Sequence, residues 1–256
     1  MKIKKQKFSK YVKSDEIKYQ EVYSDLKKKR TIDDRMRDKV LDGRLKVARF
    51  IAKKYKMYGR VMDAGGGTGW LSAELSKFSH IDEVVCLDLS ERKITTVAPE
   101  IIKRIKGKED KISLVVGDFH KFDFPDNYFD FIVFSAALHH VPEENYPVIF
   151  NELHRVLKRD GKIIAIREPI IPKLIFWRKW EVKRKEKKNK STENIYSLKQ
   201  WGKLFELNGF KFSYIPFVIT NNKMNFMNYI RKFVKYTRIF NGWFFGYYVM
   251  VGDNYE

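Results

Sequence analysis

The stretch VMDAGGGTGW constrains the fold of this chain more than any other part of the sequence. A short apolar run that contains Asp63 leads directly into Gly65, Gly66, Gly67 and Gly69. Glycine loses more backbone freedom on folding than any other residue, so this density indicates a tight turn or a close approach of backbone to a ligand. The apolar run before the glycines and WLSAEL after them predict a strand, a loop and a helix.

Short apolar segments alternate with helical patterns through most of the chain, which predicts an α/β fold with a mostly parallel sheet. We expect strands at residues 60–64, 84–88, 112–116, 129–134, 162–167, 210–218 and 244–251. We expect helices at residues 33–55 (one helix or two, with Gly43 as the interruption), 71–78, 92–105, 146–157 and 197–208. Most strand segments are apolar throughout, as strands buried on both faces are.

The spacing of the glycines argues against a dinucleotide site. Such a site needs G-x-G-x-x-G, and Trp70 occupies the place of the third glycine. A carboxylate at Asp63, just before the loop, would also repel a pyrophosphate. It suits a ligand that carries an ammonium group.

VMDAGGGTGWLSAEL resembles the first motif of class I S-adenosylmethionine-dependent methyltransferases. Further segments with the same resemblance follow in order: CLDLS, GDFHKFDFPDNYFDFIVFSAALHHV and VLKRDGKIIAIREP. The resemblance covers about residues 35–170, with a weaker similarity to residue 215. It implies a Rossmann-like sheet of seven mostly parallel strands with helices on both faces, an N-terminal helical extension and C-terminal insertions. It also implies S-adenosylmethionine as cofactor and S-adenosylhomocysteine as product.

The resemblance implies roles for the residues around the loop. Asp63 would face the ammonium group of the cofactor, Asp88 would accept the ribose hydroxyls, and Asp118 would accept the adenine amino group. Phe119 would pack on the adenine, and Ser135 would leave room for the sulfonium. The implied cofactor-binding set is Asp63, Gly65, Gly67, Gly69, Asp88, Leu89, Asp118, Phe119 and Ser135.

Each role has a purely structural alternative. Asp63 could cap the loop, and Asp88 could be an ordinary acid at a strand end. Phe119 could belong to the core, and Ser135 could be a small residue chosen for packing.

Three residues are candidates for catalysis. Methyl transfer from a sulfonium mostly needs alignment and exclusion of water, and a general base is required only for a weakly nucleophilic acceptor. His139 and His140 follow the fourth strand, at the edge where open α/β sheets bind ligands, and we rank His140 slightly ahead. Glu168 follows the fifth strand; it and the histidines could instead serve packing or ion pairing. The spacing of acids and histidines predicts no metal site.

The charge of the chain is unevenly distributed. The net charge is +20 overall, but residues 61–170 carry −4, while residues 1–60 carry +13 and residues 171–256 carry +11. The basic flanks suggest anionic partners, with simple solubility as the alternative.

We divide the chain into a basic extension or lid at residues 1–34 and a methyltransferase domain at residues 35–256. The domain carries insertions at about 170–195 and 221–241. The first contains the basic run 183–190, which could be a solvated face. The second contains aromatic residues at helical spacing, for which core packing and contact with anionic lipid are the alternatives.

A cytoplasmic protein is expected from three absences. The single cysteine, Cys86, excludes a disulfide framework, and no apolar run is long enough to span a bilayer. The N-terminus also lacks the apolar core of a secretory signal.

The sequence favours an O-methyltransferase whose substrate is a small anionic molecule, because the pattern after IREP is similar to enzymes of bacterial surface-polysaccharide biosynthesis. A nucleotide-linked or phosphorylated sugar, or a phosphate-type group of a capsule or lipopolysaccharide precursor, would be the acceptor. The alternatives are an RNA methyltransferase, a methyltransferase of a small hydrophobic metabolite, and a non-catalytic binding protein. Nucleic acid and a membrane surface are weaker candidates as partners.

Overall fold

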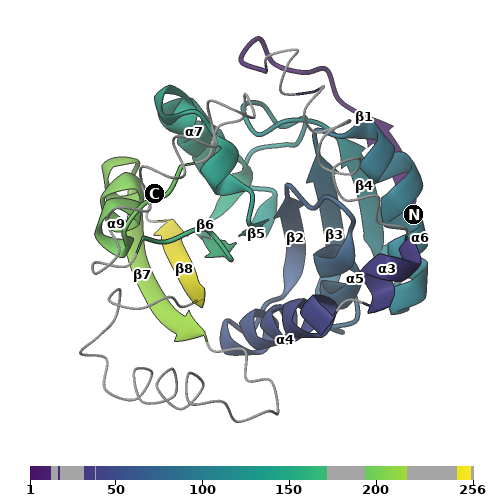
Figure 1. Cartoon of the computed structure of the whole chain (residues 1–256). Helices are drawn as coiled ribbons and strands as arrows, with labels where there is room; N and C mark the ends of the chain where they lie inside the picture. Colours follow the sequence, from purple (N-terminus) through teal and green to yellow (C-terminus); the bar gives the residue numbers. More distant parts are fainter. Residues whose placement is uncertain (13–16, 18–31, 38, 172–193, 218–246, 255–256) are drawn as a thin grey trace, which may run out of the picture.

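The computed structural model describes residues 1–12, 17, 32–37, 39–171, 194–217 and 247–254. These residues build one eight-stranded sheet in the order β1-β4-β3-β2-β5-β6-β8-β7, with helices on both faces (Figure 1). The strands from β1 to β6 in this order are parallel, and β8 runs antiparallel to both of its neighbours. The α/β architecture expected from the sequence is therefore confirmed.

The strands bury both of their faces because their residues alternate between two cores. In β2, for example, Val61 faces the core that also holds Cys86, whereas Met62 faces the core that also holds Leu87. The strand bounds are β1 Lys2–Lys5, β2 Gly59–Ala64, β3 Ile81–Asp88, β4 Ile112–Val116, β5 Phe129–Ser135, β6 Leu157–Ile166, β7 Phe210–Phe217 and β8 Tyr247–Asn254.

The helices form the two outer layers. On one face, α4, α5 and α6 share a core with the sheet, and on the other face α7 and α9 do so (Figure 1). Ser197 caps α9 with a reciprocal capping box to Gln200, which explains why this helix begins where the sequence predicts. The helix bounds are α3 Ile32–Arg37, α4 Lys39–Lys54, α5 Trp70–Leu75, α6 Ala98–Ile105, α7 Tyr146–Val156 and α9 Leu198–Leu207.

The structure corrects two details of the expected fold. The sheet has eight strands rather than seven, because Lys2–Lys5 adds to the free edge of β4. The interruption expected at Gly43 is absent, because Gly43 lies inside α4, which is continuous from Lys39 to Lys54. The basic run 183–190 and the aromatic segment 221–241 lie outside the described residues.

The N-terminal strand is followed by a segment that is tied to the end of β4. The Gln6 N–H donates to the Val116 carbonyl at 2.8 Å. The Ser9 N–H and hydroxyl donate to the two carboxylate oxygens of Asp118, at 2.8 and 3.1 Å. Tyr11 stacks on the His120 ring, with a centroid distance of 5.2 Å. The first twelve residues are thus part of the folded domain.

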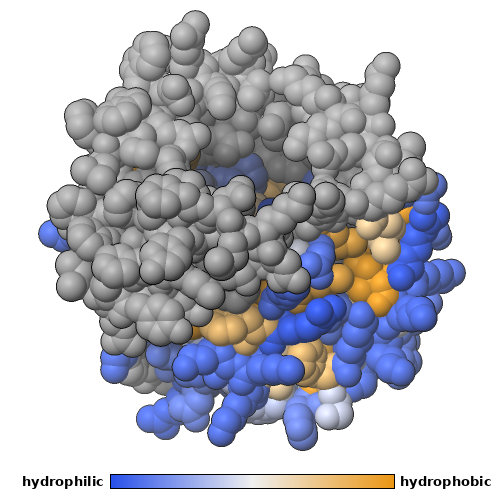
Figure 2. Space-filling model, turned by 60° about the horizontal axis from the view of Figure 1, so that its bottom comes forward, coloured by the Kyte–Doolittle hydropathy of each residue, from blue (hydrophilic) through white to orange (hydrophobic). Residues whose placement is uncertain are grey.

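Hydrophilic residues dominate the described surface on the face shown in Figure 2, with hydrophobic residues visible between them. Within the described ranges, no helix is both long and apolar enough to cross a bilayer.

Replacing Ser9 by proline tests whether its contacts hold β1 on the sheet. The substitution removes both hydrogen bonds to Asp118, and we expect it to weaken the local attachment by about 1–3 kcal/mol. Hydrogen–deuterium exchange of the β1 amides should then become faster. Ser9→Ala keeps the N–H donor and should show a smaller increase. Unchanged exchange in both variants would contradict this role of Ser9.

Candidate functional site

The candidate site lies at one edge of the sheet, where the parallel strands end. The glycine loop follows β2, Asp88 ends β3, and Asp118 comes two residues after β4. Open α/β sheets bind ligands at the carboxyl ends of their strands, at the point where successive strands begin to be added on the other side of the first strand. Here the reversal occurs at β2, which lies between β3 and β5.

The glycine loop fits between its neighbours only without side chains. A Cβ on Gly65 would lie 2.5 Å from the Ala137 Cβ and 3.2 Å from a ring atom of Phe119, so the loops after β2, β4 and β5 meet at this point. A Cβ on Gly66 would lie 2.5 Å from the Cys86 sulfur. The loop is also anchored, because the N–H groups of Gly65 and Gly66 donate to the Leu87 carbonyl.

Backbone conformation gives a second reason for glycine in the loop. Gly65, Gly67 and Gly69 all have positive φ angles, of 73°, 56° and 72°. Other residues adopt this left-handed region only at an energetic cost. The glycines are therefore required by the turn itself as well as by its contacts.

Asp63 is a fully buried carboxylate, and one of its two oxygens accepts no hydrogen bond from the described residues. Its Oδ2 accepts the Ser72 hydroxyl at 2.7 Å and the Ser72 N–H at 3.1 Å, and Oδ1 has no hydrogen-bond partner among the described residues. Burial raises the pKa of Asp63 to about 7, and the hydrogen bonds from Ser72 offset only part of this shift. An orphaned oxygen in this setting would gain from a cationic donor.

Asp88 is held in a fixed orientation at the end of β3. Its Oδ2 accepts the Gly67 N–H at 3.0 Å, and its Oδ1 accepts the Ser90 N–H at 2.9 Å. The Lys93 ammonium lies 3.9 Å from Oδ1. Leu89 follows directly and is half-buried. Asp88 thus links the glycine loop to the end of the neighbouring strand.

Asp118 already has a full set of partners. Besides the two donors of Ser9, its Oδ1 accepts the His120 N–H at 2.8 Å and lies 3.0 Å from His120 Nδ1. Burial alone would raise the pKa of Asp118, but the hydrogen bonds of His120 and Ser9 lower it below its usual value. A carboxylate has about four acceptor positions, so Asp118 could receive an adenine amino group only by releasing a present donor.

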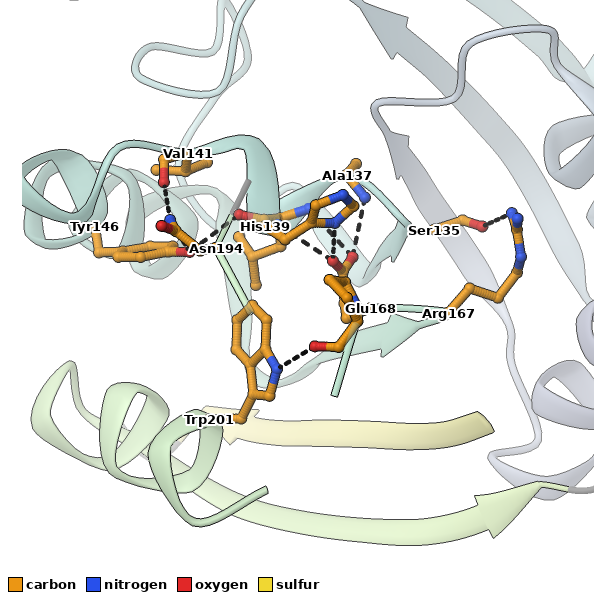
Figure 3. A network of polar contacts seen from close by, with 11 residues as sticks. Ser135, Ala137, His139, Val141, Tyr146, Arg167, Glu168, Asn194 and Trp201 are labelled. Carbon is orange, nitrogen blue, oxygen red and sulfur yellow. Dashed lines mark hydrogen bonds and ion pairs between the residues drawn. The ribbon is translucent and has the colours of Figure 1, made fainter. Parts of the chain in front are cut away.

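Glu168 and His139 form the most tightly organised pair of the site (Figure 3). The two carboxylate oxygens of Glu168 accept the N–H groups of Ala137, Leu138 and His139 at 3.0–3.1 Å, and Oε2 lies 2.6 Å from His139 Nδ1. Burial raises the pKa of Glu168, but His139 and these N–H groups more than compensate, so the pKa lies below its usual value. His140 packs against His139, with ring centroids 4.0 Å apart.

Three residues that the sequence did not single out hold the loops after β5 and β6. Tyr146 donates its hydroxyl to the Leu138 carbonyl, Asn194 donates to the Val141 carbonyl, and the Trp201 indole donates to the Pro169 carbonyl (Figure 3). Tyr146 and Trp201 come from α7 and α9. Burial, the largest cause, raises the pKa of Tyr146. The bonds of Asn194 and Trp201 join parts of the chain that are 53 and 32 residues apart, so no local sequence pattern reveals them.

Ser135 and Arg167 lie at the ends of β5 and β6. An Arg167 guanidinium nitrogen donates to the Ser135 hydroxyl at 3.3 Å (Figure 3). Arg167 and Ala136 both have left-handed backbones, with φ angles of 61° and 54°. All candidates named from the sequence thus lie along one edge of the sheet, and Ser72, His120 and Arg167 join them.

Comparison with known proteins identifies a methyltransferase domain within the chain. A family model described as a methyltransferase domain matches residues 62–165. The ubiquinone/menaquinone biosynthesis C-methyltransferase UbiE of Pectobacterium carotovorum is 33% identical over 118 residues, which is 45% of this chain and 45% of that protein. The chain therefore matches less than half of the length of this curated relative.

Solved structures share the fold over most of the chain. The YcgJ protein of Bacillus subtilis superposes with a TM-score of 0.58 at 19% identity, covering 82% of this chain and 98% of that one. The geranyl diphosphate C-methyltransferase of Streptomyces coelicolor, solved with S-adenosyl-L-homocysteine, gives a TM-score of 0.56 at 17% identity, covering 81% and 74%. Residues 62–165 thus match a methyltransferase domain, and the described fold is shared with a solved methyltransferase structure.

Proposed function

We propose that this protein transfers the methyl group of S-adenosylmethionine to a small, mainly apolar metabolite. The proposal depends chiefly on the similarity of its methyltransferase domain to C-methyltransferases of ubiquinone and menaquinone biosynthesis. A structural relative that methylates geranyl diphosphate adds support, because its substrate is also largely hydrocarbon.

This proposal differs from the acceptor that the sequence favoured. An anionic sugar was inferred from the basic flanks and from the pattern after IREP. The relatives reported above instead favour the alternative, a small hydrophobic metabolite. Most of residues 171–193, which begin the C-terminal basic flank, lie outside the described structure.

The residues at the sheet edge fit the proposed cofactor. The ammonium group would complete the free Oδ1 of Asp63, and the ribose hydroxyls would reach the fixed carboxylate of Asp88 beside Leu89. Gly65, Gly67 and Gly69 leave room for the ligand because they carry no side chain. Phe119 offers an aromatic face for the adenine, and Ser135 is a small residue beside the glycine loop. We assign Asp118 chiefly to holding the N-terminal segment.

Bound S-adenosylmethionine supplies a methyl group that is already activated by the sulfonium. His139 would accept the proton that the acceptor loses as its bond to the methyl carbon forms. Glu168 fixes the orientation of this imidazole and stabilises its charged form, as a buried carboxylate does for a histidine base. This partnership favours His139 over His140 as the base.

A direct assay tests the proposed function. The full chain would be incubated with methyl-labelled cofactor and acceptors of three classes. The apolar class consists of a demethylated quinol and a prenyl diphosphate, and the other two classes are a nucleotide sugar and RNA. We expect label in an apolar acceptor. Label only in the nucleotide sugar or only in RNA would contradict the proposal and restore an alternative. Failure to bind S-adenosylhomocysteine would contradict the assignment of the cofactor site itself.

The raised pKa of Asp63 predicts a pH-dependent affinity for the cofactor. In the free protein the carboxyl is protonated below about pH 7, whereas a bound ammonium favours the carboxylate. Binding of S-adenosylhomocysteine at pH 6 should therefore release about one proton, and affinity should rise with pH and level off above about 7. Calorimetry in buffers of different ionisation enthalpy measures the release. Asp63→Asn should abolish it, and release that persists in this variant would assign the proton to another group.

The proposed role of His139 as the base is tested by comparing substitutions of His139 and His140. His139→Ala should lower kcat by about a hundredfold or more, because it removes the base, and His140→Ala should change it much less. Glu168→Gln preserves the shape of the pair and should lower kcat with little change in the KM for the cofactor. Circular dichroism and thermal melting would confirm folding of each variant. A larger loss in His140→Ala than in His139→Ala would reverse the assignment.

A further inference from the structure

The turn that carries His139 is too short to fix its own position. It is a single 3₁₀ turn, Leu138–His140, and two backbone hydrogen bonds of 3.2 Å close it. Turns of this kind have poor hydrogen-bond geometry and are stable only in short pieces. Contacts from other elements therefore decide where the imidazole of His139 lies.

Glu168 accepts the N–H groups at the start of this turn, and Asn194 donates to carbonyl groups in and after it. The Asn194 N–H donates to the His139 carbonyl at 2.9 Å. The side-chain nitrogen of Asn194 donates to the Val141 carbonyl at 2.6 Å (Figure 3). The backbone of His139 is thus held at its nitrogen by Glu168 and at its oxygen by Asn194.

The side chain of Asn194 makes a further contact that a different residue could not make. Its Nδ2 also donates to the Tyr146 hydroxyl oxygen at 3.3 Å, and that hydroxyl donates to the Leu138 carbonyl at 3.2 Å. A carbonyl only accepts, so the amide nitrogen, and not the amide oxygen, must face Val141. An aspartate of the same shape offers no donor, and a serine offers one.

Asn194 is carried by a segment that has its own attachments to the fold. The Ile171 N–H donates to the Tyr196 carbonyl at 3.0 Å, just after the end of β6. The Tyr196 and Trp201 rings meet edge to face, with centroids 5.0 Å apart. Ser197 then caps α9. Because these contacts hold the segment independently of the turn, Asn194 is able to set the position of the turn.

Position matters for a base, because it must lie within hydrogen-bond reach of the proton that it accepts. A misplacement of about 1 Å can lower a rate by about a hundredfold. We propose that Asn194 is a positioning residue, which fixes His139 for proton transfer through its hydrogen bonds to the backbone around the turn. This inference rests on the proposed function, because it takes His139 as the base.

Kinetics on the full chain, with S-adenosylmethionine and a demethylated quinol, test the inference. The variants are Asn194→Ala and Asn194→Asp, which keeps the size of the side chain and removes both donors. The matched control is Asn208→Ala, since Asn208 also donates to a backbone carbonyl, that of Leu204 at 2.8 Å, but at the end of α9.

Both Asn194 variants should lower kcat by about tenfold and leave the KM for the cofactor unchanged, because the turn shifts while the glycine loop does not. Asn208→Ala should change neither constant. Thermal melting confirms that each variant is folded. Hydrogen–deuterium exchange of the Ala137, Leu138 and His139 amides should become faster in the Asn194 variants and stay unchanged in Asn208→Ala.

A double variant separates positioning of the base from a general structural role. If Asn194 acts through the imidazole, adding Asn194→Ala to His139→Ala should lower the remaining rate by less than about twofold. A residue that only stabilises the fold would lower the rate by the same factor in both backgrounds. An equal loss in both backgrounds, or an unchanged kcat in both Asn194 variants, would overturn the inference.

The same measurements show a failure of the proposed function separately. Absence of methyl transfer by the wild type, or an unchanged kcat in His139→Ala, would contradict the proposed acceptor or the proposed base. In that case hydrogen exchange alone decides whether Asn194 holds the turn. Faster exchange of the three amides in both Asn194 variants supports this role, and exchange equal to that of the wild type overturns it.

Discussion

The site depends on a buried carboxylate next to a loop that has no room for side chains. Asp63 is fully buried, and the added Cβ of Gly66 would lie 3.0 Å from its carboxyl group. The same loop touches Cys86 of β3 and Ala137 after β5, so its position fixes how three strand ends meet. A larger residue at Gly65 or Gly66 would therefore displace these neighbours as well as the turn.

Two buried carboxylates at this edge differ because they have different numbers of donors. Asp63 receives two hydrogen bonds, both from Ser72, and its pKa rises to about 7. Glu168 accepts three backbone N–H groups and lies 2.6 Å from His139 Nδ1, and its pKa falls below the usual value. Desolvation acts on both, so the donors decide the outcome. Asp63 is suited to take up a cation, and Glu168 is suited to hold a loop and a histidine.

The sequence predicted the features that depend on local patterns. Apolar segments predicted every strand from β2 to β8, and the glycine motif with the later motifs predicted one common edge for the site. Three features depend on contacts between distant residues and were missed. They are the pairing of Lys2–Lys5 with β4, the hydrogen bonds that Ser9 donates to Asp118, and the contact between Glu168 and the His139 ring. A strand of four exposed residues carries no burial pattern, which is why β1 could not be recognised.

The N-terminal segment changes what the motif at Asp118 means for this chain. A resemblance assigns Asp118 to adenine, but a carboxylate that accepts from Ser9 and His120 holds the start of the chain against β4. Gly117 allows this approach, because a Cβ there would lie 2.6 Å from the Gln6 side-chain oxygen. Tyr11 on His120 extends the contact beyond the strand. Asp118 therefore links the first residues of the chain to the loop after β4. A ligand that donates a hydrogen bond to Asp118 would have to displace Ser9 or His120 from the carboxylate.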